Sequence, residues 1–205
     1  MTNAEEFTQQ KYTIVPGIVP IDLCRIVTKY ALMKEEMEFS PEGPGTQVDN
    51  AHSVYGDTLM ETLLYFLRPH IEKATGKQLC PTYSYYRVYR PGDILKKHID
   101  RPACEISSTL CFGHHYTLTD ENYRWGMYVG SDVLIKQNAG DGIVYRGCEI
   151  EHWREAFNAG PNSYQVQAFF HYIDKDGPFY PDWAYDTRPN LGFRSDQNKA
   201  NQIDK

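Results

Sequence analysis

His98, Asp100 and His152 are the residues of this sequence whose types and spacing are best suited to hold a reactive metal ion. In an extended segment, side chains two positions apart share a face, so His98 and Asp100 can contact one ion while Ile99 points the other way. His152 supplies a second imidazole. Two histidines and one carboxylate leave three positions open on a six-coordinate ion such as iron, where oxygen and a bidentate cosubstrate can bind. The sequence therefore predicts a metal centre with open positions.

Short β-rich runs lie on both sides of these ligands and must position them. Residues typical of half-buried strands recur in five runs: 83–90, 104–112, 133–136, 142–146 and 164–173. Glycine, proline and asparagine separate the runs, and no helical pattern long enough to connect parallel strands intervenes. We therefore expect a mainly β domain, an antiparallel jelly roll braced by N-terminal helices.

Two amphipathic helices are expected ahead of the strands. Apolar residues recur at helical spacing over 23–31 and again over 60–67, where the side chain of Asp57 can act as the N-cap. Pro69 is expected to end or kink the second helix, and Gly76 marks its last possible end. Both helices should pack their apolar faces against the strands.

The rest of the chain completes a single domain over residues 1–194. The segment 40–56 is rich in proline, glycine and asparagine and is expected to form a loop. Near the C-terminus, 178–183 can pack as a lid, and 195–205 is expected to be a flexible tail. A chain of 205 residues has room for one core of ordinary size and none for a second full domain.

Composition and charge narrow the classes of partner. Hydrophobic residues make up 41% of the chain, and no apolar run reaches the ~20 residues that a membrane span requires. The formal net charge is −6 and no basic run stands out, so neither a membrane nor a nucleic acid is expected as a partner. The N-terminus lacks the pattern of a secretory signal, and the five cysteines include no CxxC pair. We therefore expect reduced thiols and a cytoplasmic location, while the sequence sets no oligomeric state.

The residues around the ligands resemble a known family. Tyr-Arg-Pro-Gly at 89–92 precedes the His-Ile-Asp of 98–100, and Gly-Asp-Gly-Ile-Val at 140–144 leads to His152. These motifs resemble the prolyl-hydroxylase-like branch of the 2-oxoglutarate and Fe(II)-dependent dioxygenases. The resemblance implies a double-stranded β-helix that uses Fe(II), 2-oxoglutarate and O₂. It also implies hydroxylation of an unactivated C–H bond with release of succinate and CO₂.

The resemblance covers 83–172, with 12–31 similar to the helical entry of the family, but one expected residue is missing. Members of this branch carry an arginine or lysine on the strand after the second histidine, where it pairs with the far carboxylate of 2-oxoglutarate. This chain has no basic residue between Arg154 and Lys175. Arg154 is therefore our candidate, because an extended segment would turn it inward with His152 and a guanidinium binds a carboxylate bidentately.

Other residues can share in binding the cosubstrate. Arg154 can instead be a surface residue that pairs with a neighbouring glutamate, and this alternative stays open. Tyr89 aligns with a family tyrosine whose hydroxyl helps to hold the cosubstrate, and otherwise it is a tyrosine of a core strand. Further candidates for the same role are Arg87, Gln167, Lys136 and Arg124.

Residues beside the ligands are candidates for binding the substrate. Arg101 and Glu105 follow the metal carboxylate closely and can orient a polar substrate, or they can simply pair with each other at the surface. Trp153, next to the second histidine, can wall the site or serve as a packing residue. Adjacent residues of a strand face opposite ways, so His114 and His115 make a poor pair of ligands and we place them in a loop.

The leading interpretation is an oxygenase that hydroxylates a small polar, amino-acid-like metabolite or a peptidyl residue. Two alternatives stay open. One is a catalytically silent jelly-roll module that binds a metabolite or a partner. The other is a cupin-like metalloenzyme that uses the same ligands with Zn²⁺ or Mn²⁺ and without 2-oxoglutarate. The histidines His70 and His171 are expected to be structural or exposed.

Overall fold

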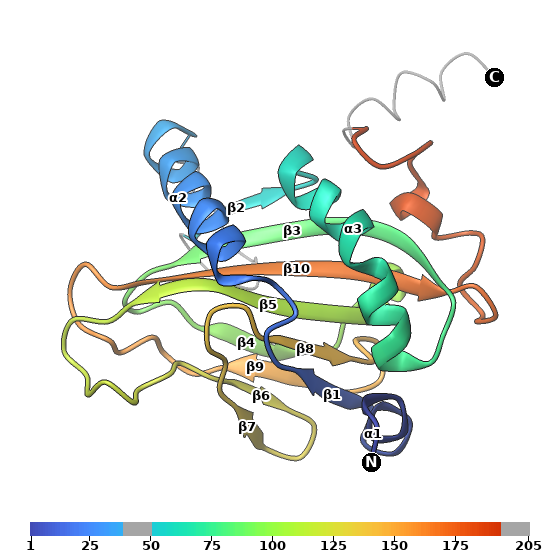
Figure 1. Ribbon diagram of the computed structural model, residues 1–205, viewed down its shortest axis with the longest axis horizontal. Coiled ribbons are helices and arrows are strands. Elements are labelled where there is room, and N and C mark those ends of the chain that lie inside the picture. Colours follow the sequence, from blue (N-terminus) through green and yellow to red (C-terminus); the bar gives the residue numbers. More distant parts are fainter. Residues whose placement is uncertain (39–50, 194–205) are drawn as a thin grey trace.

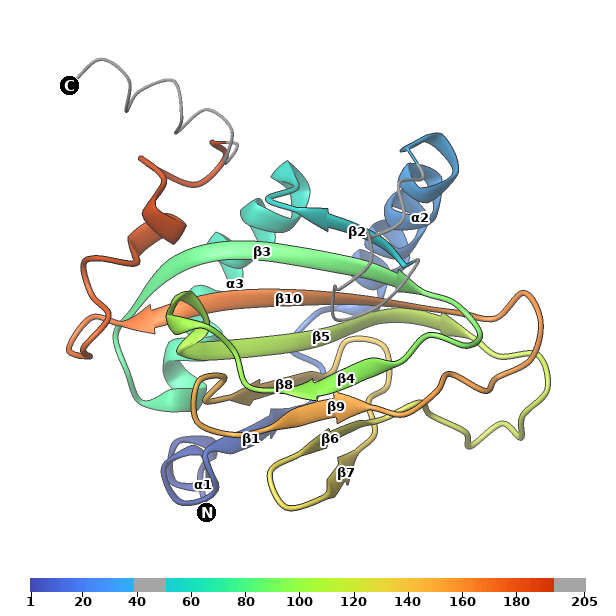
Figure 2. The same cartoon turned by 180° about the vertical axis from the view of Figure 1, so that it is seen from behind.

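Two antiparallel sheets form most of the structure, a computed structural model that describes residues 1–38 and 51–193. The larger sheet contains, in spatial order, β1 (Tyr12–Val15), β8 (Gly142–Tyr145), β5 (Ile106–His115), β10 (Tyr164–Asp174), β3 (Leu79–Tyr89) and β2 (His52–Tyr55). The smaller sheet contains β4 (Leu95–His98), β9 (His152–Arg154), β6 (Met127–Val129) and β7 (Val133–Ile135). Figure 2 shows β4 and β9 in front of the larger sheet. The predicted mainly β jelly roll is confirmed.

Helices cover the outer face of the larger sheet (Figure 1). The helices are α1 (Asn3–Gln10), α2 (Ile21–Glu38) and α3 (Thr58–Thr75), and two 3-10 turns follow, η1 (Pro102–Cys104) and η2 (Ala184–Thr187). Apolar residues of the helices, such as Val27 and Leu64, share one buried core with strand residues such as Tyr86 and Phe170. Removing this apolar surface from water holds helices and sheet together. No helix in the described part of the chain has the length and hydropathy of a membrane span.

The helix predicted over 60–67 forms α3 and continues past Pro69 to the expected limit at Gly76. Asp57 caps it, because its carboxylate accepts hydrogen bonds from two N–H groups of the first turn at 3.0 and 3.2 Å. Pro69 lies inside the helix, so it does not end the helix, which was one of the two effects expected of it. Core contacts of Ile71, beyond the proline, offset the backbone hydrogen bond that a proline cannot donate. The helix ends at Gly76, which adopts the left-handed conformation.

Several regular elements escape the sequence patterns. The short helix α1 is marked only by a capping box, in which Thr2 and Glu5 bind each other's backbone N–H groups. The segment 12–31, expected as a helical entry, begins with the strand β1, which pairs with β8. The strand β2 occupies the end of the segment 40–56 that was expected to be a loop. Residues 39–50 lie outside the described residues.

The inner face of the larger sheet carries many polar side chains. Successive side chains of a strand alternate between faces, so β3, β5 and β10 send one set of residues to the helices and another into the space between the sheets. The second set includes the buried residues Ser107, Thr109, Gln165, Gln167, His171, Tyr83 and Tyr89. The jelly roll therefore encloses a polar interior beside β4 and β9, the strands that carry the predicted histidine ligands.

The last described residues, 178–193, run past the ends of β3 and α3 (Figure 1), and we term them the C-terminal strap. Its Arg188 is almost fully buried and forms an ion pair of 2.6 Å with Glu61 of α3. The same guanidinium donates to the carbonyl of Thr82 at 2.9 Å. The strap is therefore fixed to the helix and the sheet by a buried charge pair. The predicted tail, 195–205, lies outside the described residues.

We expect Arg188→Met to lower the free energy of unfolding by about 3–5 kcal/mol, because it leaves the carboxylate of Glu61 buried and unpaired. Urea unfolding followed by circular dichroism measures the change. The double variant with Glu61→Leu should recover most of the loss, since both charges are then gone. Arg25→Met breaks a pair with Asp22 that is largely exposed and should change stability by under ~1 kcal/mol. Similar losses in the two single variants would contradict the role of the buried pair.

Candidate metal centre

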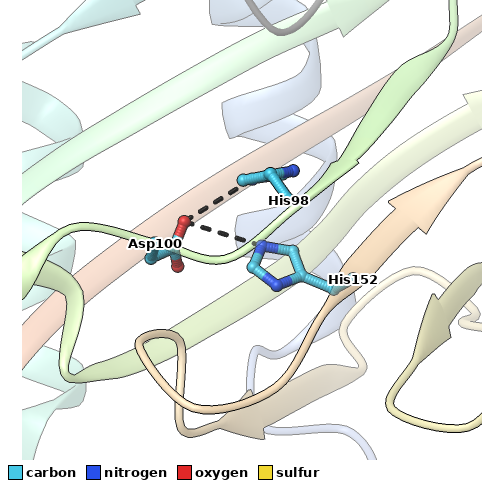
Figure 3. A group of neighbouring side chains, drawn as sticks. All are labelled: His98, Asp100 and His152. Carbon is cyan, nitrogen blue, oxygen red and sulfur yellow. Dashed lines mark ion pairs between the residues drawn. The ribbon is translucent and has the colours of Figure 1, made fainter.

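The three predicted ligands lie together beside β4 and β9 (Figure 3). Nε2 of His98 lies 3.5 Å from Oδ1 of Asp100, and Nε2 of His152 lies 3.6 Å from the same oxygen. Ligand atoms bound at ~2.1 Å and at right angles on one ion stand roughly 3 Å apart. A small shift of side chains would therefore close these atoms around a cation. One donor atom from each residue lies within 4.8 Å of the others.

An irregular register in β4 brings the two histidines face to face. His98 pairs with His152 and Leu95 pairs with Arg154, so three steps along β4 match two steps along β9. In a regular strand, residues three apart would point to opposite faces. The extra residue forms a bulge that sends Lys96 and Lys97 outward and returns both Leu95 and His98 to the inner face. No local sequence pattern marks this bulge.

The ring of each histidine is oriented by a backbone carbonyl. Nδ1 of His98 lies 2.7 Å from the carbonyl of Lys96, and Nδ1 of His152 lies 3.2 Å from that of Ile150. A carbonyl oxygen only accepts, so each Nδ1 carries a proton and Nε2 is the nitrogen of each ring that is left to bind a metal. Histidines that bind metals are held in this way. Both Nε2 atoms face Asp100 (Figure 3).

Asp100 is fixed by the backbone and by Ser107. Its N–H donates to the carbonyl of Gly147 at 2.8 Å, and its Oδ2 accepts from Oγ of Ser107 at 2.9 Å. Burial alone would raise the pKa of this carboxyl, but hydrogen bonds with His152 and His98 outweigh it and hold the pKa well below its usual range. Asp100 is therefore an ionised ligand at neutral pH, and its Oδ1 is the oxygen that faces the histidines.

Gly147 leaves no room for a side chain beside this carboxylate. A Cβ there would lie 2.4 Å from Oδ2 of Asp100 and 2.7 Å from Oγ of Ser107. We expect Gly147→Ala to displace Asp100 and to weaken binding of a divalent ion about 10–100-fold, measured by titration with Co(II). The control is Gly142→Ala, whose closest contact would be a methyl group of Ile18 at 3.2 Å. An equal affinity of the two variants for Co(II) would contradict the steric argument.

A fully buried arginine lies on the same face of β9 as His152. Arg154 has no exposed surface, and its Nη1 donates to the carbonyl of Trp125 at 2.9 Å. Burial lowers the pKa of its guanidinium, and no carboxylate of the described residues pairs with it. The predicted inward orientation is confirmed, and the alternative of a surface ion pair with a neighbouring glutamate is wrong. A buried cation without a counter-charge is unfavourable, which indicates a site for an anion.

Tyr89 places a second unsatisfied group near this arginine. Its side chain is fully buried and its hydroxyl has no hydrogen-bond partner, as is also true of Nε of Arg154. The guanidinium carbon lies 6.0 Å from the centre of the Tyr89 ring. Buried polar groups are almost always paired, so two such groups close together point to a missing polar ligand.

Gln167, another candidate, is already engaged. Its amide nitrogen donates to Oγ1 of Thr109 at 2.7 Å and to Oε1 of Gln137 at 2.9 Å, which uses both of its N–H groups. Gln137 lies in turn 3.4 Å from Nη2 of Arg154. Gln167 is therefore placed to orient the surroundings of the arginine rather than to bind a ligand through its amide nitrogen.

Arg87 and Arg124 are engaged by other groups. Arg87 is buried on the face of β3 that carries Tyr89, and its guanidinium packs over the rings of Tyr85 and Phe169. Arg124 is held at the surface by Asn138 and by backbone carbonyls. Of the candidates for anchoring a carboxylate, Arg154 alone combines full burial with inward orientation from a ligand-bearing strand.

The expected substrate residues Arg101 and Glu105 do not pair with each other. Arg101 donates to both carboxylate oxygens of Asp186 in the C-terminal strap, at 2.6 and 2.8 Å, and packs over the ring of Tyr83. Glu105 accepts instead from the backbone N–H of Asp174 at 2.8 Å. The half-exposed Arg101 is thus paired with the C-terminal strap, whereas Glu105 serves a backbone contact.

Two other expectations are corrected. Trp153 lies on the face of β9 opposite to the ligands, where it stacks on Tyr128 and under the amine of Lys97, so it does not wall the site. His114 and His115 belong to β5 rather than to a loop, because this strand stays paired with β10 to its last residue.

Sequence reasoning missed the partners of the metal carboxylate. Ser107 and His171 face each other across β5 and β10, and Nδ1 of His171 lies 2.9 Å from Oγ of Ser107. Burial lowers the pKa of His171 to about 4, so the ring is neutral at pH 7. No local pattern could identify this pair, because it depends on the register of two strands far apart in the sequence.

Among the comparisons with known proteins, only the comparison of structures finds similar proteins. No family model and no curated protein matches the sequence. A prolyl-4-hydroxylase of Pseudomonas putida has a TM-score of 0.61 at 16% identity, over 82% of this chain and 96% of that one. A prolyl hydroxylase of Trichoplax adhaerens, solved with a peptide of a hypoxia-inducible factor, has a TM-score of 0.64 at 9% identity, over 85% and 88%.

A third structural match has a different reaction in its name. The α-ketoglutarate-dependent carbocyclase SnoK from nogalamycin biosynthesis has a TM-score of 0.63 at 14% identity, over 85% of this chain and 83% of that one. Identities this low speak for a shared fold. The chain therefore has the jelly-roll fold of the 2-oxoglutarate and Fe(II) oxygenases, in agreement with the resemblance of its motifs.

Proposed function

We propose that this chain is an Fe(II)- and 2-oxoglutarate-dependent dioxygenase that hydroxylates a C–H bond of a small polar molecule or of a peptidyl residue. One observation carries the proposal. Two histidines and an aspartate converge beside a barrel whose interior also holds a fully buried arginine, without a carboxylate partner in the described part of the chain. A metal site next to an anion site fits a cosubstrate that must chelate the ion and also carries a second carboxylate.

The donor set fits iron in the ferrous state. His98, His152 and the ionised Asp100 would hold the ion and leave three positions open. When bound, iron, 2-oxoglutarate and oxygen supply the oxidation that inserts one oxygen atom into the substrate and releases succinate and CO₂. The residues of the chain contribute position, charge and exclusion of water.

Arg154 and Tyr89 would bind the far carboxylate of 2-oxoglutarate. That carboxylate would give the buried guanidinium a counter-charge and would accept from both the unpaired Nε of Arg154 and the hydroxyl of Tyr89. Because both residues are fully buried, these hydrogen bonds would form away from competing water. This arrangement moves the anchor from the strand after the second histidine to the strand of that histidine.

The substrate class rests on the surroundings of the open positions. Solved proteins of this fold include a prolyl hydroxylase in complex with a peptide and a carbocyclase from nogalamycin biosynthesis. In this chain Arg101, the residue after Asp100, has a half-exposed guanidinium whose N–H groups not used by Asp186 can orient a polar group of either kind. A small polar metabolite or a peptidyl side chain is therefore proposed as the acceptor of oxygen.

Anaerobic mixing with Fe(II) and 2-oxoglutarate tests the proposal. A visible metal-to-ligand charge-transfer band is expected, because it requires both molecules on one centre. A silent binding module would give no band and no tight metal, whereas a cupin-like metalloenzyme would bind metal without developing the band. Absence of the band in folded, metal-loaded protein would reject the assignment. Succinate release stimulated by candidate metabolites or peptides would then identify the substrate.

A further inference from the structure

We propose that Ser107 and His171 are positioning residues that make the metal carboxylate bind through one oxygen. The inference rests on the proposed metal site and deepens it. Ser107 and His171 are buried, and Oγ of Ser107 lies 2.9 Å from Oδ2 of Asp100 and 2.9 Å from Nδ1 of His171. The three groups form a continuous chain that ends on the oxygen of Asp100 that does not face the histidine ligands.

The direction of each hydrogen bond follows from the groups themselves. An ionised carboxylate only accepts, so the hydroxyl proton of Ser107 is directed to Asp100. Oγ of Ser107 must then accept from His171, which fixes the proton of His171 on Nδ1. The carbonyl of Cys104, 3.1 Å from Oγ of Ser107, is a competing acceptor. Hydrogen bonds to a charged group are stronger, which favours Asp100 over this neutral carbonyl.

The surroundings prevent the carboxylate from turning. The ring of His171 packs against Tyr83 with centroids 4.5 Å apart, and His171 is only 5% exposed, so water does not compete for Ser107. On the other side, the backbone of Gly147 approaches Asp100 so closely that not even a Cβ would fit. Rotation of the carboxylate would break its bond with Ser107 and leave Oδ2 buried without a partner.

Binding through one oxygen matters because of the number of open positions. Two imidazoles and one oxygen occupy three of the six positions of an octahedral ion and leave three for a bidentate cosubstrate and oxygen. If both oxygens of Asp100 bound the ion, only two positions would remain, too few for both. Ser107 and His171 would therefore preserve the vacancy that the proposed reaction requires.

The same geometry explains a second group of possible ligands. Asp100, Cys104 and His171 have donor atoms within 4.8 Å of one another. Oγ of Ser107 already forms hydrogen bonds with both Asp100 and His171. The serine hydroxyl therefore satisfies these two groups without a second cation.

The test compares Ser107→Ala and His171→Phe with the control Ser108→Ala, using Co(II) as the probe. Ser108 is also buried on β5, but its hydroxyl donates to the carbonyl of Phe170 and its side chain belongs to the opposite face. We expect Ser107→Ala to weaken Co(II) binding about 10–100-fold and to change the ligand-field absorption, which reports coordination number. His171→Phe keeps an aromatic ring at this position but removes the N–H that donates to Ser107. It should therefore change the Co(II) affinity and the absorption less than Ser107→Ala does.

The outcomes decide between positioning and mere packing. If Ser107→Ala binds Co(II) with the affinity and spectrum of Ser108→Ala, the proposal is overturned. If circular dichroism shows that the Ser107→Ala apoprotein does not fold, His171→Phe is compared with Ser108→Ala instead. Equal Co(II) affinity and spectra of these two variants would then overturn the proposal. Wild-type protein that binds no Co(II) would overturn this inference together with the metal site. Wild-type protein that binds Co(II) but gives no charge-transfer band with Fe(II) and 2-oxoglutarate would reject the proposed oxygenase alone.

Discussion

Arg154→Met should strongly weaken binding of 2-oxoglutarate while leaving the fold at least as stable as before. The loss follows because the far carboxylate would be buried without its cation, at a cost of about 2–5 kcal/mol, or at least a roughly 30-fold weaker affinity. Stability should be unchanged or higher by about 1–4 kcal/mol, because an apolar side chain of similar size replaces a buried, uncompensated charge.

Calorimetric titration of 2-oxoglutarate into the anaerobic Fe(II)-loaded protein measures the first effect, and urea unfolding of the apoprotein measures the second. The control is Arg124→Met. The sequence also makes Arg124 a candidate for binding the cosubstrate, but the structure places it at the surface. Unchanged affinity in Arg154→Met would place the anchor elsewhere. A drop in stability together with unchanged affinity would mean that Arg154 serves packing.

His98→Ala and His152→Ala should each remove stoichiometric iron binding and turnover without unfolding the protein. Each removes one of two neutral nitrogen ligands, and no other described histidine has a donor atom in the group formed with Asp100, His98 and His152. The cost in stability should stay below ~2 kcal/mol for His98, whose side chain is 17% exposed and lies at the rim of the barrel.

Iron content after anaerobic loading and desalting, together with succinate release, measures these losses. His70→Ala is the matched control, because His70 is an exposed histidine of α3. Retention of iron by His98→Ala or His152→Ala would show that the ion is held by other residues. Cooperative unfolding of the apoprotein at markedly lower urea concentration would mean that the histidine in question is structural.

The parts of the fold that the sequence predicts correctly are those set by local periodicity. The β-rich run that forms β5, the helical spacing around Leu64 and the cap at Asp57 each depend on residues that are near neighbours in the sequence. The metal ligands belong to this class in part, because His98 and Asp100 share a face through a spacing of two. Their meeting with His152 was predicted from the combination of residue types and from the family resemblance, rather than from local periodicity.

What the sequence does not predict depends on contacts between distant segments. Arg101 finds Asp186 in the strap rather than Glu105, although Glu105 is much nearer in the chain. Trp153 faces outward because the register of β9 assigns the inner face to its neighbours. Such outcomes follow from tertiary packing, which overrides local preference and leaves no trace in a short window of sequence.

The extra residue in β4 affects how this chain aligns with proteins of the same fold. A regular strand would reach the same inward histidine with one residue fewer after Leu95, so such a relative would align with a single-residue gap inside the strand. A sequence pattern that fixes the number of residues between the Pro91-Gly92 turn and His98 would therefore miss a relative with a regular strand. It would do so even though the metal ligands of the two proteins occupy the same positions in space.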